Sequence, residues 1–165
     1  MPKKQLETIY QISRLKSYLG YKSILVEKIK ALTGIDGGKL FVDVLDVNED
    51  NKEGYPVCWV LEQTGKGQIL DTHRNEREWQ FAIVIHQEVK QKDRRDAYMA
   101  LVDAADRVIK AIDEDPMLAD PHGQARCKFV KVMPAFFEYA AEELPLHKAL
   151  LEVAIVDIVN RYIPA

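Results

Sequence analysis

The clearest pattern of hydrophobic and polar positions lies in the middle of the chain, between residues 55 and 113. Hydrophobic residues alternate with polar ones over residues 78–88, which predicts a strand whose buried face is formed by Trp79, Phe81, Ile83 and Ile85. An earlier strand is predicted over residues 55–63, with Pro56 at its start because proline donates no ladder hydrogen bond. Residues 64–77 between them are polar and contain glycine, which predicts a long loop.

A helix is predicted after residue 92, where the spacing of hydrophobic residues changes to the helical period. Asp93 is the expected N-cap or first-turn acid, and Pro116 stops any continuation of the helix. The hydrophobic stripe, with charged residues opposite it, consists of Tyr98, Leu101, Val102, Ala105, Val108, Ile109 and Ile112. This amphipathic pattern is typical of a helix that packs on a sheet.

Residues 5–33 carry a second helical pattern, which we expect to be broken near Gly20. Ser23 is the expected cap of the second piece, and Gly34 stands where the glycine that follows a helix end belongs. Residues 40–47 alternate less regularly and predict a strand that is half exposed.

Two long strand-like segments, residues 125–139 and 148–162, close the chain. The second is hydrophobic at both odd and even positions, so both of its faces should be covered, by helices or by another subunit. A buried helix is the competing interpretation of such a run, but its many β-branched residues favour a strand.

The predicted elements together indicate an α+β fold. We expect a mixed or antiparallel β-sheet of about four to five strands, packed by an N-terminal helix and one central amphipathic helix. The chain of 165 residues has the size of a single domain, residues 1–165, in which residues 1–20 form an N-terminal helical extension.

Composition and charge exclude some classes of protein but do not indicate a single function. The formal net charge is −3, so the composition does not draw the whole chain to nucleic acid. No hydrophobic run approaches the roughly 20 residues that span a bilayer, and the polar N-terminus lacks the hydrophobic region of a signal peptide. We therefore expect a soluble, intracellular protein with no membrane partner.

A mild basic cluster surrounds the central strand and the start of the central helix, at Arg74, Arg77, Lys90, Lys92, Arg94 and Arg95. An RNA-binding sheet would also need exposed aromatic residues beside such cations, whereas Trp79 and Phe81 are predicted to point inward. An exposed face bearing Tyr55 and Trp59 would restore the RNA-binding interpretation.

The sequence contains no recognisable catalytic or metal-binding motif. Its four histidines have neither HxH nor HExxH spacing, and residues 120–123 make a good turn as readily as a metal site. Residues 64–67 lack the spacing of a phosphate-binding loop, and neither Cys58 nor Cys127 stands in a nucleophile motif. We expect no enzyme activity, no metal and no cofactor. Both thiols are expected to be buried and reduced, with a disulfide as the alternative.

Four features of the central region follow one another in a distinctive order. They are an aromatic–proline strand entry at residues 55–56, Arg77 at the start of the next strand, the amphipathic helix at residues 97–112, and a D-P-x-L turn at residues 115–118. This order resembles the tail terminator (tail completion, minor tail protein U-like) family of long-tailed bacteriophages. The resemblance covers residues 22–162. The chain departs from it in its additional helical sequence at residues 5–20 and in a longer, more acidic strand at residues 40–47.

The resemblance implies a structural protein of the virion tail, assembled in the host cytoplasm. Such a protein forms a ring with copies of itself, expected to be a hexamer, which caps the tail tube and ends its polymerisation. Its further partners are the tail tube protein and the head–tail connector protein, and DNA passes through the lumen of the ring without specific binding. A related head–tail connector (neck) protein, or a small α+β module that binds a ligand or RNA, is the alternative.

Partner contacts are expected in two segments, the loop at residues 64–77 and the turn at residues 120–124, because loops on a rigid scaffold often carry recognition. The candidate contact residues in these segments are Lys66, His73, Arg74, Arg77 and His122.

Overall fold

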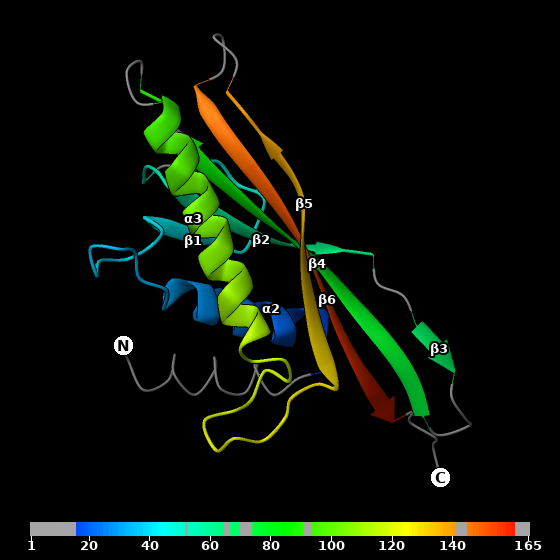
Figure 1. Ribbon diagram of the computed structural model, residues 1–165. Helices are drawn as coiled ribbons and strands as arrows, with labels where there is room; N and C mark the ends of the chain where they lie inside the picture. Colours follow the sequence, from blue (N-terminus) through cyan, green and yellow to red (C-terminus); the bar gives the residue numbers. More distant parts are fainter. Residues whose placement is uncertain are drawn as a thin grey trace.

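The computed structural model describes residues 16–51, 53–64, 67–69, 74–90, 94–140 and 145–160, which form one sheet with two helices packed on it (Figure 1). In chain order the elements are α2 (Tyr18–Lys30), β1 (Asp43–Leu45), β2 (Val57–Gln63), β3 (Gly67–Ile69), β4 (Arg74–Glu88), α3 (Arg94–Asp113), β5 (Phe129–Glu138) and β6 (Leu146–Asn160). This arrangement confirms the predicted α+β class, with an N-terminal helix and one central helix.

The sheet is mixed, and its strands lie in the order β1-β2-β4-β6-β5. β1 pairs with β2 in parallel, and all other pairs are antiparallel. β4 and β6, each 15 residues long, pair along their whole length at the centre of the sheet. The short strand β3 pairs with β4 beyond the end of β2, so it extends the sheet at that end.

The prediction of a loop over residues 64–77 is wrong for most of its described part. β3 lies within this range, and β4 already begins at Arg74, so Arg74 and Arg77 belong to a strand. Pairing with the end of β6, where Arg77 faces Asp157, holds this stretch extended. Its charged sequence resembled a loop because these residues lie beyond the hydrophobic part of the strand, which begins at Trp79.

Helix α2 runs through Gly20 without a break, contrary to the prediction. Its N-cap is Ser17, whose Oγ accepts a hydrogen bond from the Gly20 backbone N–H at 3.1 Å. Ser23 lies inside the helix and caps nothing, and the C-cap is Ala31. Gly34 lies beyond the helix in a turn, where its N–H donates to the Gly38 carbonyl. Residues 1–15, including most of the predicted extension, lie outside the described residues.

The remaining predicted strands are present in the structure, but they begin and end at other residues than predicted. The strand at residues 40–47 shortens to β1, of which Val44 is buried. The two closing segments become β5 and β6, so the strand interpretation of the last hydrophobic run is confirmed over that of a buried helix. The expected cap of the central helix, Asp93, lies outside the described residues.

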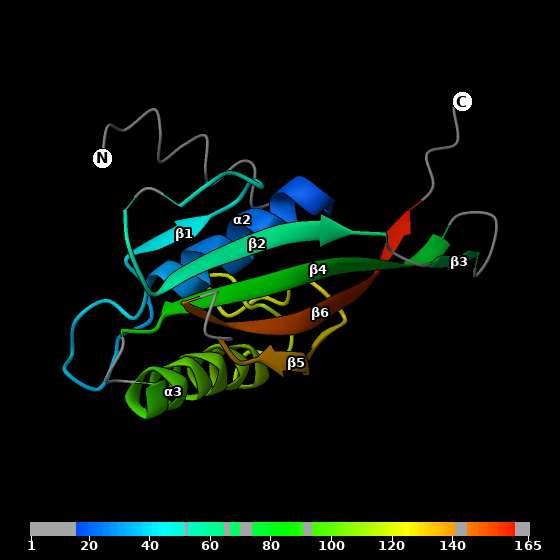
Figure 2. The ribbon, with the colours of Figure 1, turned by 90° about the horizontal axis from the view of Figure 1, so that it is seen from above.

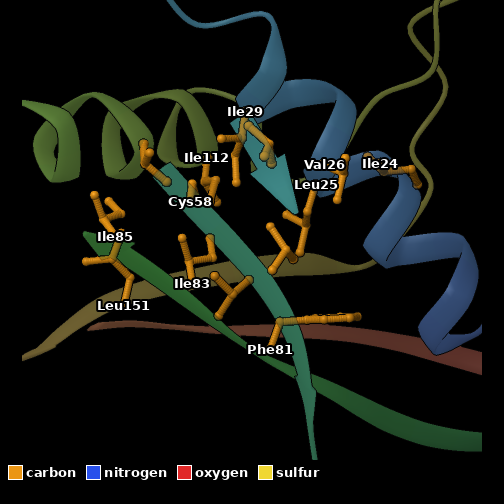
Figure 3. Packing of buried hydrophobic residues seen from close by; sticks show 14 of the residues in the cluster. Ile24, Leu25, Val26, Ile29, Cys58, Phe81, Ile83, Ile85, Ile112 and Leu151 are labelled. Atoms are coloured by element: carbon orange, nitrogen blue, oxygen red, sulfur yellow. The ribbon is translucent and has the colours of Figure 1, made fainter. Parts of the chain in front are cut away.

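Both helices pack on the same face of the sheet, and the core lies between them and the strands (Figure 3). Leu25 and Ile29 from α2 and Ile112 from α3 meet Cys58 on β2 and Ile83 on β4. The buried residues of α3 are Ala97, Leu101, Ala104, Ala105, Val108 and Ile112. This set confirms the predicted stripe at Leu101, Ala105, Val108 and Ile112, while Tyr98, Val102 and Ile109 are only half-buried.

Cys58 and Cys127 are both buried free thiols, as expected. Burial raises the pKa of the Cys58 thiol far above its ordinary value. Burial, with a smaller contribution from the negative charge of Asp157, raises the pKa of Cys127 to about 12. Both groups are therefore protonated at neutral pH, which leaves them poor nucleophiles and poor metal ligands.

Candidate interaction surface

The face of the sheet opposite the two described helices carries a row of hydrophobic side chains that crosses four strands. Side chains alternate between the faces of a strand, so the registers place Trp59, Val84, Leu150 and Phe136 side by side on this face. Trp59 is 8% exposed, Val84 and Leu150 are half-buried, and Phe136 is 50% exposed. This row belongs to what we call the open face of the sheet.

The next row of the open face is hydrophobic at both of its ends. Leu61, Ala82, Glu152 and Met133 lie opposite one another, and Met133 on the edge strand β5 is 62% exposed. The helices cover one face of the last strand, as expected, and cover of the open face by another subunit stays a prediction. Exposed hydrophobic side chains grouped in this way are typical of protein interaction sites.

A pocket of about 500 Å³ lies on the open face beside the loop at residues 46–56. Its floor is made by Trp59 and Leu61 of β2 and by Val84 and His86 of β4, and Tyr55 stands on one wall. The indole Nε1–H of Trp59 donates to the Glu49 carbonyl oxygen at 3.0 Å, which holds the loop against the sheet. We call this hollow the sheet-face pocket.

The sheet-face pocket has an aromatic floor and an acidic rim. The rings of Trp59 and His86 pack with their centroids 4.6 Å apart. Burial, together with the positive charge of Lys148, lowers the pKa of His86, so its ring is neutral at pH 7. The exposed residues Glu49 and Asp50 supply negative charge at the rim. Such a pocket favours a group that is cationic and partly apolar, and it disfavours a phosphate.

The loop that forms this rim is held at both ends. Asn51 Nδ2 donates to the Gly54 carbonyl oxygen at 2.7 Å, and Asn51 Oδ1 accepts from the backbone of the same turn. At the other end, Lys22 Nζ of α2 donates to the Asp46 carbonyl oxygen at 2.7 Å and forms an ion pair with Glu62 of β2. The rim is therefore shaped before any partner arrives.

The opposite end of the sheet projects beyond the helices as an arm made of β3 and the paired ends of β4 and β6 (Figures 1 and 2). Arg77 lies exposed on this arm and makes no ion pair with any residue that the structure describes. Its neighbour across the ladder is Asp157, whose carboxylate is held by Lys16 Nζ at 2.7 Å and by the Tyr21 hydroxyl at 3.2 Å.

The residues expected to contact partners do not form one site in the described part of the chain. Lys66 and His73 lie outside the described residues, and so does the side chain of Arg74. Arg77 lies on the arm, whereas His122 is exposed in the turn after α3. There the Asp120 carboxylate accepts the backbone N–H of His122 at 2.9 Å, so these residues form the turn that was the alternative to a metal site.

The sequence interpretation missed the sheet-face pocket, and it noted hydrophobic residues on both faces only for the last strand. Trp59, Val84 and Leu150 carried a detectable signal, because β2, the middle of β4 and β6 are each hydrophobic at odd and even positions. Tyr55 and Trp59 line one pocket, but they do not form the exposed face that was the condition for RNA binding. Trp59 is largely buried, and the acidic rim of the pocket opposes a phosphate backbone.

Other kinds of site are not apparent in the described residues. Among them, no group of three or more His, Cys, Asp or Glu side chains could hold a metal ion. No helix in the described ranges is both long and hydrophobic enough to cross a membrane. In comparisons with known proteins, no protein-family model matches the chain, and no curated protein matches its sequence.

Proposed function

We propose that this protein is a tail terminator of a long-tailed bacteriophage, a structural subunit whose copies form a ring that caps the tail tube. The observation that carries the proposal is the open face, where exposed Phe136 and Met133 stand at the edge-strand ends of two neighbouring rows. A surface of this kind suits contact with another protein subunit. The order of sequence features from residue 55 to residue 118 directs the choice of the family.

Two further features support a ring. The open face and the arm are different surfaces, and a contact between two different surfaces is heterologous, which closes into a ring when the rotation allows it. The net charge of −3 suits a lumen through which DNA moves without binding, because basic walls would hold its phosphates. In this function the ring ends tube polymerisation and forms the joint with the head–tail connector protein.

A module that binds a small ligand is the second candidate, and the sheet-face pocket favours it. Its volume of about 500 Å³ lies within the range of small-molecule sites, and its floor is mainly hydrophobic. A ligand-binding module would keep its activity as a monomer, whereas a terminator would lose its function without self-assembly. A related head–tail connector protein would also assemble but would leave tail length unchanged.

Self-assembly tests the proposal through the exposed residues of the open face. We expect the purified chain to form a closed oligomer, measured by size-exclusion chromatography with light scattering and seen as rings by negative-stain electron microscopy. The Met133→Glu/Phe136→Glu variant is expected to be monomeric, because two charges would have to be buried in the contact. Met117, which is also exposed but lies in the turn after α3, supplies the control, and Met117→Glu is expected to assemble normally. A wild-type chain that is monomeric at all concentrations would contradict the proposal.

A further inference from the structure

The sheet-face pocket and Arg77 lie at opposite ends of the same strand. Val84 and His86 of β4 form part of the pocket floor, and Arg77 lies seven to nine residues earlier on the arm. At the rise of an extended strand, this separation is roughly 25 Å. Arg77 therefore cannot enter the pocket of its own chain.

Arg77 and the pocket also lie on opposite faces of the sheet. Arg77 has the parity of Trp79 and Phe81, which point toward the helices, but it lies beyond the hydrophobic core. The pocket lies on the open face. When copies repeat around a ring, each related to the next by the same rotation, the helix side of one can meet the open face of the next. Arg77 of one copy and the pocket of its neighbour are thus on the two surfaces that such a ring brings together.

The chemistry of the two surfaces is complementary. The Arg77 guanidinium is exposed, and Asp157 beside it is already engaged by Lys16 and Tyr21. The pocket supplies the half-buried ring of Tyr55 and the exposed carboxylates of Glu49 and Asp50. A guanidinium stacks well on an aromatic ring and pairs with carboxylates at the same time. Lys148 beside His86 is the nearby cation, and Glu138 lies across the ladder from it.

We propose that Arg77 on the arm of one copy inserts into the sheet-face pocket of the next copy, between Tyr55 and the acidic rim. This inference rests on the proposed self-assembly and identifies the contact that would give the ring its direction. Because the two surfaces differ, each copy donates one arginine and receives one. The contact is therefore heterologous, and each copy meets its two neighbours through different surfaces.

Charge exchange between the two surfaces tests the proposal. Arg77→Glu and the double change Glu49→Arg/Asp50→Arg are each expected to weaken association by roughly tenfold or more, measured by light scattering over a concentration series. Combining all three changes is expected to restore most of the association, since the opposite charges meet again with their positions exchanged. Lys39→Glu, which makes the same change of charge at an exposed position outside the sheet and both helices, is the control and should assemble as the wild type does.

A second Arg77 variant keeps the test valid if Arg77→Glu does not fold. Arg77→Glu places a carboxylate beside Asp157, so thermal unfolding followed by circular dichroism should accompany it, and Arg77→Gln replaces it if the fold is lost. Three outcomes overturn the inference. The first is normal assembly of both Arg77 variants, as expected if the pocket holds a small cationic ligand. The second is a triple variant that assembles no better than its parents. In the third, the wild-type chain itself stays monomeric, and the proposed function fails as well.

Discussion

His147 is a buried polar residue that joins three elements. Its side chain is 3% exposed, and Nδ1 accepts the backbone N–H of Ala140 at 2.8 Å. Nε2 then carries the proton and lies 3.2 Å from the Arg94 carbonyl oxygen at the start of α3. Arg94 Nη1 returns a hydrogen bond to the Ala140 carbonyl oxygen at 3.0 Å. The ring of His147 therefore attaches the first turn of α3 to the β5–β6 connection.

Replacing His147 by alanine should destabilise the fold by about 2 kcal/mol, because it leaves the buried Ala140 N–H without an acceptor and removes the bond between α3 and the ring. His122→Ala is the matched control, since that histidine is exposed and only its backbone bonds the turn; its effect should stay within about 0.5 kcal/mol. Urea unfolding followed by circular dichroism measures both. Equal losses of stability would show that the buried ring does not hold these elements together.

At the scale of elements, the sequence identified the hydrophobic parts of strands and helices but placed several ends wrongly. The stripe at Leu101, Ala105 and Val108 was predictable because burial imposes the helical period on it. The start of β4 was not, because Arg74 and Arg77 are held extended by pairing with β6, far away in the sequence. The same applies to the sheet-face pocket, whose rim is formed by a polar loop that the sequence shows only as a loop.

The start of α2 can be tested by mutation, because the structure gives Ser17 as its N-cap and the sequence predicted Ser23. Ser17→Ala should cost about 1 kcal/mol, since the Gly20 N–H loses its acceptor. Ser23→Ala should be neutral or slightly stabilising, because alanine favours a helix interior more than serine does. Thermal and urea unfolding of the two variants give the comparison. The opposite order of stabilities would show that the helix begins at Ser23, as its sequence pattern predicted.

At the scale of the whole molecule, the two faces of the sheet differ in their surroundings: one is covered by helices, and the other is partly exposed. The face under α2 and α3 holds the core, and it accounts for most of the pattern that the sequence displays. The open face adds little to that core but exposes Phe136 and Met133 and contains the sheet-face pocket. A single chain therefore presents an arm, a pocket and an apolar surface, which suits a subunit that acts by contacting its neighbours.

The most direct test of the proposed function is the tail length of virions made without this protein. On the proposed function, deletion of the gene should give tails of variable length that exceed those of the parent phage, because nothing then ends tube polymerisation. Supplying the wild-type gene in trans should restore the parental length, measured on electron micrographs of many particles. Tails of parental length in the deletion mutant would contradict the claim that this chain is a tail terminator.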